Sequence, residues 1–473
     1  MTNSTFFWHD YETFGIDPQR DRASQFAGIR TDQDFNVIDD PVMLYCQTAD
    51  DYLPQPEACL ITGITPQLAT EKGVCEAEFI RVIHNELSQP GTCGLGYNSL
   101  RFDDEVTRNL LYRNFYDPYG REFQNNNSRW DLIDVVRATY ALRPDGINWP
   151  LNDEGVATFR LELLTQANDI SHQAAHDALS DVYATIAMAK LIKQRQPKLY
   201  EFLYQNRYKH TATDLLNVGS FKPVVHISGR FAAKNHCLAI VLPLCEHPLR
   251  KTEIIVYDLS VDPAPLLELS AEEIQQRVFT ATADLAEGVE RIPLKTIHIN
   301  KYPVIAPYKV IRPADAERLK LDLAKCQRHL QTIQAQATGL NSKLAQVFGR
   351  EYGEGSQDPD LMIYSGGFFT PKDKATMAKI RQTTPEKLAG FKADFVDGRL
   401  EEMLFRYRGR NYPNTFNSEE LQQWQQFCRQ RLDAKTLASY KTKLVDLQAD
   451  YGEDNPILKQ LREFAQNKQN ALV

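Results

Sequence analysis

The sequence predicts an α/β fold with a mixed sheet, followed by a small β-barrel with a helical insert and an all-α C-terminal region. Three observations lead to this prediction. Apolar β-rich runs come first, and strands and amphipathic helices then alternate up to about residue 195. After Pro197, short β-branched runs are separated by turns, and from Thr370 onward the periodic segments are all helical. We therefore expect three domains, at residues 1–196, 197–350 and 353–473.

The first domain begins with strands that are separated by loops rich in Gly, Asp and Pro. We expect them at residues 6–12, 25–31 and 42–47, with a fourth strand at 92–97. Helical periodicity between and after the strands places helices on both faces of the sheet. The expected helices begin at Pro66 and cover residues 75–87, 104–114, 128–142, 160–167 and 178–193.

The rest of the chain changes from β-rich to helical. Apolar β-branched runs occur at residues 223–228, 237–242 and 253–259, with shorter ones at 296–300 and 304–305. Ser270 and Glu273 form a capping-box pattern that opens a helix. A long helical region follows from 313 to 348, and a polar, Gly-rich linker covers 350–359. The last expected helices are 373–382, 385–391, 398–406, 417–431, 434–451 and 455–469.

Composition and charge exclude several classes of protein. The chain has 473 residues, of which 42% are hydrophobic and 25% charged, and no apolar run is long enough to span a membrane. The first residues lack the basic start of a signal peptide, and the eight cysteines form no C-x-x-C pair. We expect a cytoplasmic monomer with reduced thiols. The net charge of −8 argues against a general nucleic-acid coat but allows a local basic groove.

Two acidic residues interrupt the first expected strand. Asp10 and Glu12 follow Phe6-Phe7-Trp8 and are two residues apart, so they project from the same face of the strand. Two carboxylates in an apolar strand repel each other and lose hydration, and a divalent cation relieves both costs. For an isolated D-x-E pattern, an edge strand with one solvent-exposed face is the better interpretation. The metal hypothesis therefore depends on further acids downstream.

Further acids and a histidine do follow. Asp103 lies at an expected strand-to-helix junction, Asp181 lies on the helix at 178–193, and His176 precedes Asp181 by five residues. Singly, these could be an N-cap, a solvated helix acid and a surface residue. Together, four acids and one histidine are the residues needed for two-metal phosphoryl hydrolysis, in which cations clamp the phosphate and the histidine accepts a proton from water.

The motifs and their surroundings resemble a known family. Asp10-x-Glu12, Asn98-x-x-x-Phe102-Asp103 and His176-x-x-x-x-Asp181 resemble the three motifs of the DEDDh exonucleases, which have a ribonuclease H-like fold. The chain is similar to the bacterial exodeoxyribonuclease I family nearly end to end, most strongly at residues 9–15, 60–66, 96–98, 101–109 and 175–178. The resemblance implies a ribonuclease H-like exonuclease domain, an SH3-like β-barrel domain with a helical insert and a helical C-terminal domain.

The resemblance also implies a reaction and a set of site residues. The reaction is processive, Mg²⁺-dependent 3′→5′ degradation of single-stranded DNA to 5′-mononucleotides, in DNA repair and recombination. Two Mg²⁺ ions, for which Mn²⁺ can substitute, would be held by Asp10, Glu12, Asp103 and Asp181. His176 would be the general base. The terminal nucleotide or its phosphate would contact Glu12, Thr13, Thr62 and Arg160.

Basic residues mixed with aromatic ones indicate candidate binding surfaces. Seven Lys or Arg residues and only two acids lie between residues 195 and 235, interleaved with tyrosines and phenylalanines. Sequence-neutral binding of a single strand requires this combination, although we expect at least half of these aromatics in the core. As exposed DNA contacts we select Arg108, Arg137 and Lys209.

The resemblance implies a protein partner as well, the acidic C-terminal tail of single-stranded DNA-binding protein. Arg143 and Arg312 are candidate anchors for the terminal carboxylate of that tail. An intramolecular ion pair is an equal alternative for each of them.

Two other functions are weighed against the exonuclease. A DEDDh ribonuclease or proofreading module would share the site, but the long chain beyond residue 196 argues against it. A catalytically silent single-strand binder would share the groove. However, carboxylates beside phosphate weaken pure binding unless a metal is present, so the intact acid set argues against a silent binder.

Overall fold

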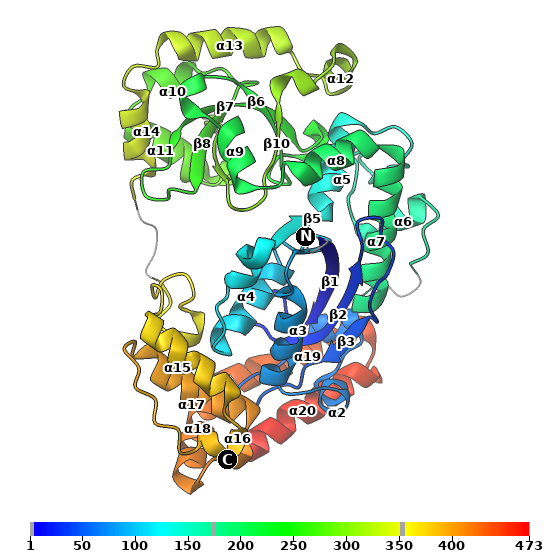
Figure 1. Ribbon diagram of the computed structural model, residues 1–473, viewed down its shortest axis with the longest axis vertical. Helices are drawn as coiled ribbons and strands as arrows, with labels where there is room; N and C mark the ends of the chain where they lie inside the picture. The colour runs from blue at the N-terminus through cyan, green and yellow to red at the C-terminus, as the bar shows by residue number, and fades with distance from the viewer. Residues whose placement is uncertain (1–3, 173–175, 351–354, 473) are drawn as a thin grey trace. The chain divides into compact units, whose positions relative to one another are not determined.

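The computed structural model describes residues 4–172, 176–350 and 355–472. The chain separates into two compact units, each described by itself below. The first comprises Met1–Arg129, His172–Ile186 and Glu354–Val473, and the second Trp130–Ser171 and Ala187–Gly353. The described residues form two five-stranded sheets (Figure 1). The predicted domain boundaries, of which residue 353 lies outside the described residues, stay a prediction.

The first sheet has the strand order β3-β2-β1-β4-β5 and is mixed, as predicted. β1 pairs antiparallel with β2 and parallel with β4, and β2 pairs antiparallel with β3. β1 is therefore the central strand, with neighbours on both edges. The strands are β1 (Thr5–Thr13), β2 (Ala23–Thr31), β3 (Val42–Tyr45), β4 (Thr92–Gly96) and β5 (Ser128–Asp131).

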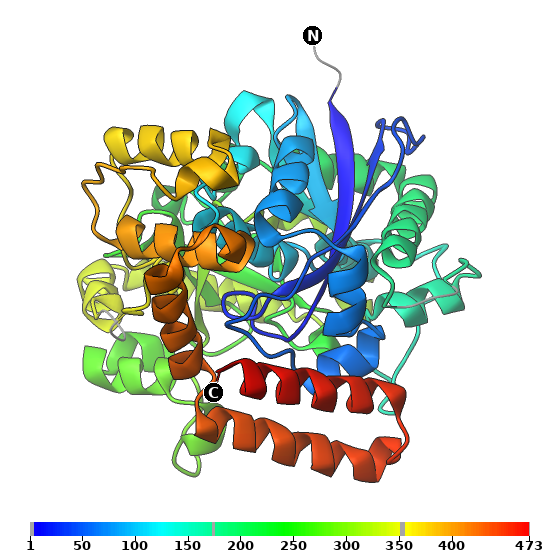
Figure 2. The same cartoon turned by 90° about the horizontal axis from the view of Figure 1, so that it is seen from below.

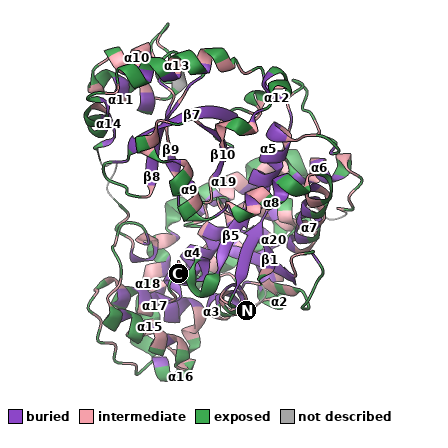
Figure 3. Ribbon diagram, turned by 45° about the horizontal axis from the view of Figure 1, so that its top comes forward, coloured by how far each residue is buried: buried purple, intermediate pink, exposed green. Residues whose placement is uncertain are grey.

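Apolar packing fills one face of this sheet. Phe7 and Tyr11 of β1 and Phe26 of β2 pack against buried residues of α3 (Glu76–Leu87) and α4 (Asp103–Arg113). β1 and β2 are buried along most of their length, as Figure 3 shows for β1. Because neighbouring residues of a strand face opposite sides, Asp10 and Glu12 face away from α3 and α4.

The C-terminal helices pack on the turn that follows β1. α19 and α20 lie side by side, and α20 contacts α1 (Pro56–Thr62) and α2 (Pro66–Lys72) (Figure 2). Phe14, Ile64, Leu444 and Leu458 contribute to this core. The C-terminal helices are α15 (Pro371–Gln382), α16 (Pro385–Leu388), α17 (Arg399–Asn411), α18 (Ser418–Arg431), α19 (Ala434–Tyr451) and α20 (Pro456–Leu472).

The second unit contains an antiparallel sheet with the order β10-β6-β7-β8-β9. Its strands are β6 (Val224–Ile227), β7 (Leu238–Glu246), β8 (Glu253–Asp258), β9 (Leu294–His298) and β10 (Val304–Pro307). A capping box formed by Ser270 and Glu273 opens α11, as predicted. The helices after the first unit's sheet are α5 (Leu132–Leu142), α6 (Leu161–Ala167), α7 (Ala178–Arg195), α8 (Pro197–Gln205), α9 (Lys209–Leu215), α10 (Ala264–Glu268), α11 (Ala271–Phe279), α12 (Pro313–Arg318), α13 (Leu323–Ala335) and α14 (Leu340–Phe348).

Some elements differ from the prediction. The helix expected at 128–142 begins only at Leu132, because Ser128–Asp131 forms the edge strand β5 and Asp131 caps the helix. The short helices α1, α8 and α9 were not predicted; α8 and α9 lie in the stretch that the sequence marks only as basic and aromatic. No helix among the described residues is long and apolar enough to cross a membrane.

Buried ion pairs join the C-terminal helices to the first sheet's loops. Arg410 of α17 lies 2.9 Å from Asp51 and 2.6 Å from Asp360, and all three side chains are almost fully buried. Burial alone would raise the pKa of Asp51, but the guanidinium groups of Arg410 and Arg22 lower it to about 2. Removal of one partner from such a network leaves a buried uncompensated charge, so these contacts hold the loops and helices in one arrangement.

Candidate metal and catalytic site

The site is built on the C-terminal half of β1. Asp10 and Glu12 lie on the same face of this strand, and Glu12 is only 8% exposed. Glu12 pairs with Gln25 of β2 across the sheet, next to an irregularity in the register between Glu12 and Thr13. The sheet thus places a half-buried carboxylate, Asp10, and a buried one, Glu12, on one face of the same strand.

Asp103 joins them from the first residue of α4. It is 3% exposed, and its Oδ1 accepts a hydrogen bond of 3.0 Å from the backbone N–H of Tyr11. The bond ties the start of α4 to the middle of β1, between the two acidic positions. The neighbouring Asp104 has a different environment, since it receives bonds from Arg121 (2.6 Å) and Arg129 (2.7 Å).

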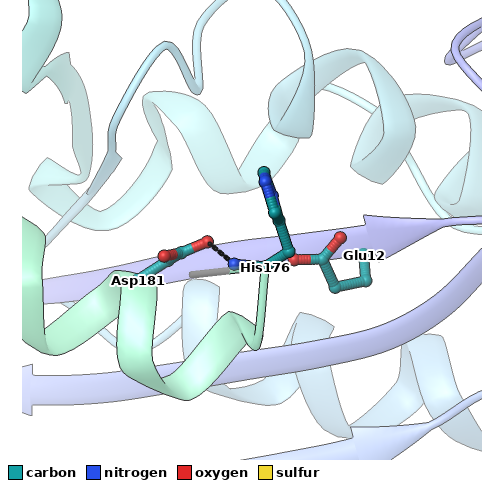
Figure 4. A group of neighbouring side chains, drawn as sticks. All are labelled: Glu12, His176 and Asp181. Atoms are coloured by element: carbon teal, nitrogen blue, oxygen red, sulfur yellow. Dashed lines mark hydrogen bonds between the residues drawn. The ribbon is translucent and has the colours of Figure 1, made fainter. Parts of the chain in front are cut away.

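Asp181 and His176 come from the start of α7. The backbone N–H of His176 donates to Asp181 Oδ2 at 3.2 Å, and His176 adopts a positive φ of 68°. One ligand atom each of Glu12, His176 and Asp181 lie within 4.8 Å of one another (Figure 4). The motif residue Ala175 lies outside the described residues. The fold therefore brings Glu12, near the start of the chain, next to His176 and Asp181.

The carboxylates raise one another's pKa values. Burial is the largest cause for Asp10, and the charges of Asp103 and Glu12 raise its pKa further above the ordinary value. Burial and the charges of Asp181 and Asp103 raise the pKa of Glu12 to about 8. Burial also raises the pKa of Asp181, against the opposing hydrogen bond from His172.

This donor set fits hard divalent cations. Carboxylate oxygens are the ligands that Mg²⁺ and Mn²⁺ prefer, and cations would remove both the repulsion and the desolvation cost that raise these pKa values. The residues that would hold them are Asp10, Glu12, Asp103 and Asp181.

Three contributors to this site were not predicted. His172 bonds to Asp181 Oδ1, and Asp177 adds to the negative charge around Asp10 and Glu12. Gln25 binds Asp177 Oδ1 and the backbone of Ala178. Asp177 directly follows His176 within the stretch 175–178 that resembles the family, so an acid at this position could have been predicted to belong to the site. Nothing in the local sequence marks His172 or Gln25.

The residues expected at the terminal nucleotide have local partners. The hydroxyl of Thr13 donates to Gly15 O at 2.6 Å, and that of Thr62 donates to Ala58 O at 3.0 Å. Arg160 is exposed and pairs with Glu162, with Nε 2.6 Å from Oε1. Their contacts with a nucleotide stay predictions.

The three cations selected as exposed differ in their exposure. Lys209, the first residue of α9, is exposed as expected. Arg137 is half-buried and lies 2.9 Å from Asp134. The expected exposure of Arg108 was wrong. Arg108 is 7% exposed because it is held by Glu122 and Glu105, each at 2.7 Å.

Arg143 and Arg312 both contact one carboxylate. Arg312 Nε lies 2.7 Å from Asp315 Oδ2, and Arg143 lies 3.2 Å from the same oxygen. Arg318 is 4.0 Å away from the second oxygen. The intramolecular ion pair considered from the sequence is present for both. Three guanidinium groups around one carboxylate nevertheless leave this patch positively charged.

Three family models match the chain: Exonuclease at residues 7–189, the Exonuclease I SH3-like domain at 207–350, and the Exonuclease I C-terminal domain at 357–468. Exodeoxyribonuclease I of Escherichia coli (strain K12) is 48% identical over 467 residues, which cover 98% of each chain. Exodeoxyribonuclease I of Haemophilus influenzae is 45% identical over 464 residues, 97% of this chain and 98% of the relative.

Solved structures agree with these matches. The crystal structure of E. coli Exonuclease I with a dA16 oligonucleotide has a TM-score of 0.96 at 48% identity, over 98% of this chain and 100% of that one. The zinc-bound form of the E. coli enzyme with single-stranded DNA has a TM-score of 0.95 at 47% identity, over 99% and 100%. A structure of SSB/Exonuclease I with an inhibitor has a TM-score of 0.91 at 46% identity, over 99% and 100%.

The raised pKa of Glu12 predicts how the metal-free protein responds to pH. The pKa of Glu12 is about 8 in the folded chain, against an ordinary value of 4.5. The protonated carboxyl therefore stabilises the fold fully below pH 4.5, and this stabilisation is lost as the pH rises through 8. We expect the thermal midpoint of the EDTA-treated protein to fall more steeply over this range than that of Glu12→Gln. Excess Mg²⁺ should reduce the difference. Equal slopes for both proteins in EDTA would contradict the assignment.

Proposed function

The chain belongs to the exodeoxyribonuclease I family, and from this we infer that it is a Mg²⁺-dependent, processive 3′→5′ exonuclease that degrades single-stranded DNA to 5′-mononucleotides. The observation that carries the proposal is the convergence of Asp10, Glu12, Asp103 and Asp181 with His176 at one end of β1. A role in DNA repair and recombination in the cytoplasm belongs to the same proposal.

Different side chains of the protein would carry out different parts of the reaction. The four carboxylates would hold two divalent cations, which when bound supply positive charge to the scissile phosphate and its leaving oxygen. His176 is exposed and has a ring nitrogen in reach of the Glu12 and Asp181 carboxylates, which suits it to accept the proton of the attacking water. Glu12, Thr13 and Thr62 would contact the terminal nucleotide, and Arg160 its phosphate.

A basic and aromatic cluster in the second unit, in which Arg207 is buried and Tyr208, Lys209 and His210 are exposed, suits a single strand. The guanidinium of Arg207 lies 3.7 Å from the ring centre of Tyr204 and 4.2 Å from that of Tyr208. The ring of Tyr208 in turn stacks on His210 at 5.7 Å. Lys209 is the exposed first residue of α9 and lies between Tyr208 and His210 in the sequence. Stacked rings beside a cation can take bases and phosphates without reading sequence. Arg137 is retained as a further proposed DNA contact, and the same role for Arg108 would require it to leave Glu105 and Glu122.

The positively charged patch around Asp315 suits an acidic peptide. We propose that Arg143 and Arg312 bind the terminal carboxylate of the tail of single-stranded DNA-binding protein. Burial and the charge of Arg312 lower the pKa of Arg143, so a second anion here relieves repulsion. Arg318 also lines a cavity of about 540 Å³ with Lys234, Lys320 and Leu321, which adds cationic and apolar surface.

The main test uses a 5′-labelled single-stranded DNA oligonucleotide with Mg²⁺ and an EDTA control. We expect products that shorten from the 3′ end, and no products in EDTA. Asp181→Ala should lose at least about a hundredfold in rate, because one metal ligand is removed, and should still shift the oligonucleotide in a gel. Wild-type cleavage by Asp181→Ala would disprove the site. If the wild type leaves the label at full length but shifts it in a gel, the silent binder is favoured instead. If the wild type cuts an RNA oligonucleotide in preference to DNA, the ribonuclease is favoured.

Lys209→Ala should weaken strand binding and lower its salt dependence. The loss of one phosphate contact reduces the slope of log K against log salt by about 0.7. Binding is measured by fluorescence anisotropy over a salt series, in EDTA to prevent cleavage. Lys435→Ala, which changes an exposed lysine on α19, serves as the matched control. A slope unchanged from the wild type would remove Lys209 from the DNA path.

Arg312→Ala should weaken binding of a labelled peptide with the acidic tail sequence by about tenfold or more, because a charge-assisted bond to its carboxylate is lost. Arg143→Ala is expected to act in the same direction. Arg462→Ala, an exposed arginine of α20, is the control for net charge. Equal affinities for the Arg312 variant and the control would place the tail elsewhere on the chain.

A further inference from the structure

Gln25 is a polar side chain in the middle of the first sheet. It lies on β2 directly opposite Glu12 and is only 1% exposed. A carboxamide is tolerated in such a position when its donors and acceptor are bonded, since an unbonded buried amide is costly. Its bonding partners therefore indicate what the residue is for.

The partners of Gln25 are on β3 and at the start of α7. Its Nε2 donates to the hydroxyl of Tyr45 at 3.0 Å and to Asp177 Oδ1 at 3.4 Å. Its Oε1 accepts from the backbone N–H of Ala178, the first residue of α7, at 3.3 Å. One buried side chain thus holds two consecutive residues of the segment that carries His176 and Asp181.

This segment needs an anchor because charge repels it from the sheet. β1 carries Asp10 and Glu12, and the start of α7 carries Asp177 and Asp181. The ionised carboxylates all have negative charge, so their repulsion pushes the two elements apart. Asp181 N–H bonds to Asp177 O at 3.0 Å, so a shift of Asp177 is transmitted through the first turn to Asp181. His176 precedes Asp177 directly and would move with it.

We propose that Gln25 is a positioning residue that fixes the start of α7 against β1 and so sets Asp181 and His176 in register with Glu12. The inference rests on the proposed function for the role of those two residues, but the mechanical link is a property of this chain. The effect of Gln25 passes through its bonds to Asp177 and Ala178.

The test substitutes Gln25→Met, which keeps the volume and removes the bonds. Groups that orient metal ligands typically contribute about 10- to 100-fold to metal affinity or activity. We expect kcat on the oligonucleotide to fall by that factor while KM changes less than about twofold. Mn²⁺ binding, measured directly by calorimetry without DNA, should weaken by a similar factor. The thermal midpoint in EDTA serves as a measure of folding.

Two further variants keep the experiment decisive. Tyr45→Phe removes the hydroxyl on the other side of the amide and should cause a smaller loss in the same direction, even if Gln25→Met folds poorly. Ser24→Ala changes the adjacent residue of β2, which is fully buried and whose hydroxyl has no hydrogen-bond partner among the described residues, so kinetics and Mn²⁺ binding should stay at wild-type values.

The outcomes separate this inference from the proposed function. Unchanged kcat and Mn²⁺ binding in a folded Gln25→Met protein would overturn the positioning role, as would a loss matched by Ser24→Ala. If the wild type does not cut DNA but Gln25→Met still weakens Mn²⁺ binding, the proposed function fails and the positioning role stands.

Discussion

Mutual repulsion of buried carboxylates at one end of β1 is the constraint on which the rest of the structure depends. Asp10 and Glu12 have raised pKa values because burial and neighbouring acids both oppose their ionisation. Such a group of charges persists only where the surrounding fold holds its members in place. The central position of β1, the bond from Tyr11 N–H to Asp103 and the contacts at the start of α7 supply that restraint. Cations would convert the repulsion into binding energy.

Arginines neutralise buried acids elsewhere in the first unit. Asp104, next in sequence to Asp103, has a lowered pKa because Arg129 and Arg121 outweigh the cost of its burial. Glu76 is similar, since Arg113 counteracts burial and brings its pKa to about 2. Asp103, adjacent to Asp104, is in contrast one of the acids whose charge raises the pKa values of Asp10 and Glu12. An acid count alone therefore does not locate the site, because arginines hold other buried acids, such as Asp104 and Glu76, in the ionised form.

Another buried arginine, Arg410, joins the C-terminal helices to the rest of the first unit. Arg410, Asp360 and Asp51 form ion pairs that connect α17 with the segment after β3. Beside them, α20 covers the turn between α1 and α2, where Thr65 Oγ1 donates to Gln460 at 2.7 Å. The predicted nucleotide-contacting residue Thr62 is the last residue of α1, directly before that turn. The C-terminal region therefore supports the surroundings of the site, although none of the predicted catalytic residues comes from it.

The sequence by itself determined the features that follow from local geometry. Alternation along a strand placed Asp10 and Glu12 on one face, helical periodicity gave most helices within a few residues, and the motifs carrying Asp103, His176 and Asp181 identified the family. Only the tertiary structure decided what depends on contacts distant in the chain. It made Ser128–Asp131 an edge strand, buried Arg108 against Glu122, and brought Gln25 to Asp177, 152 residues away. Periodicity records which face of an element is apolar, but the partner of a polar side chain is set by how the elements pack.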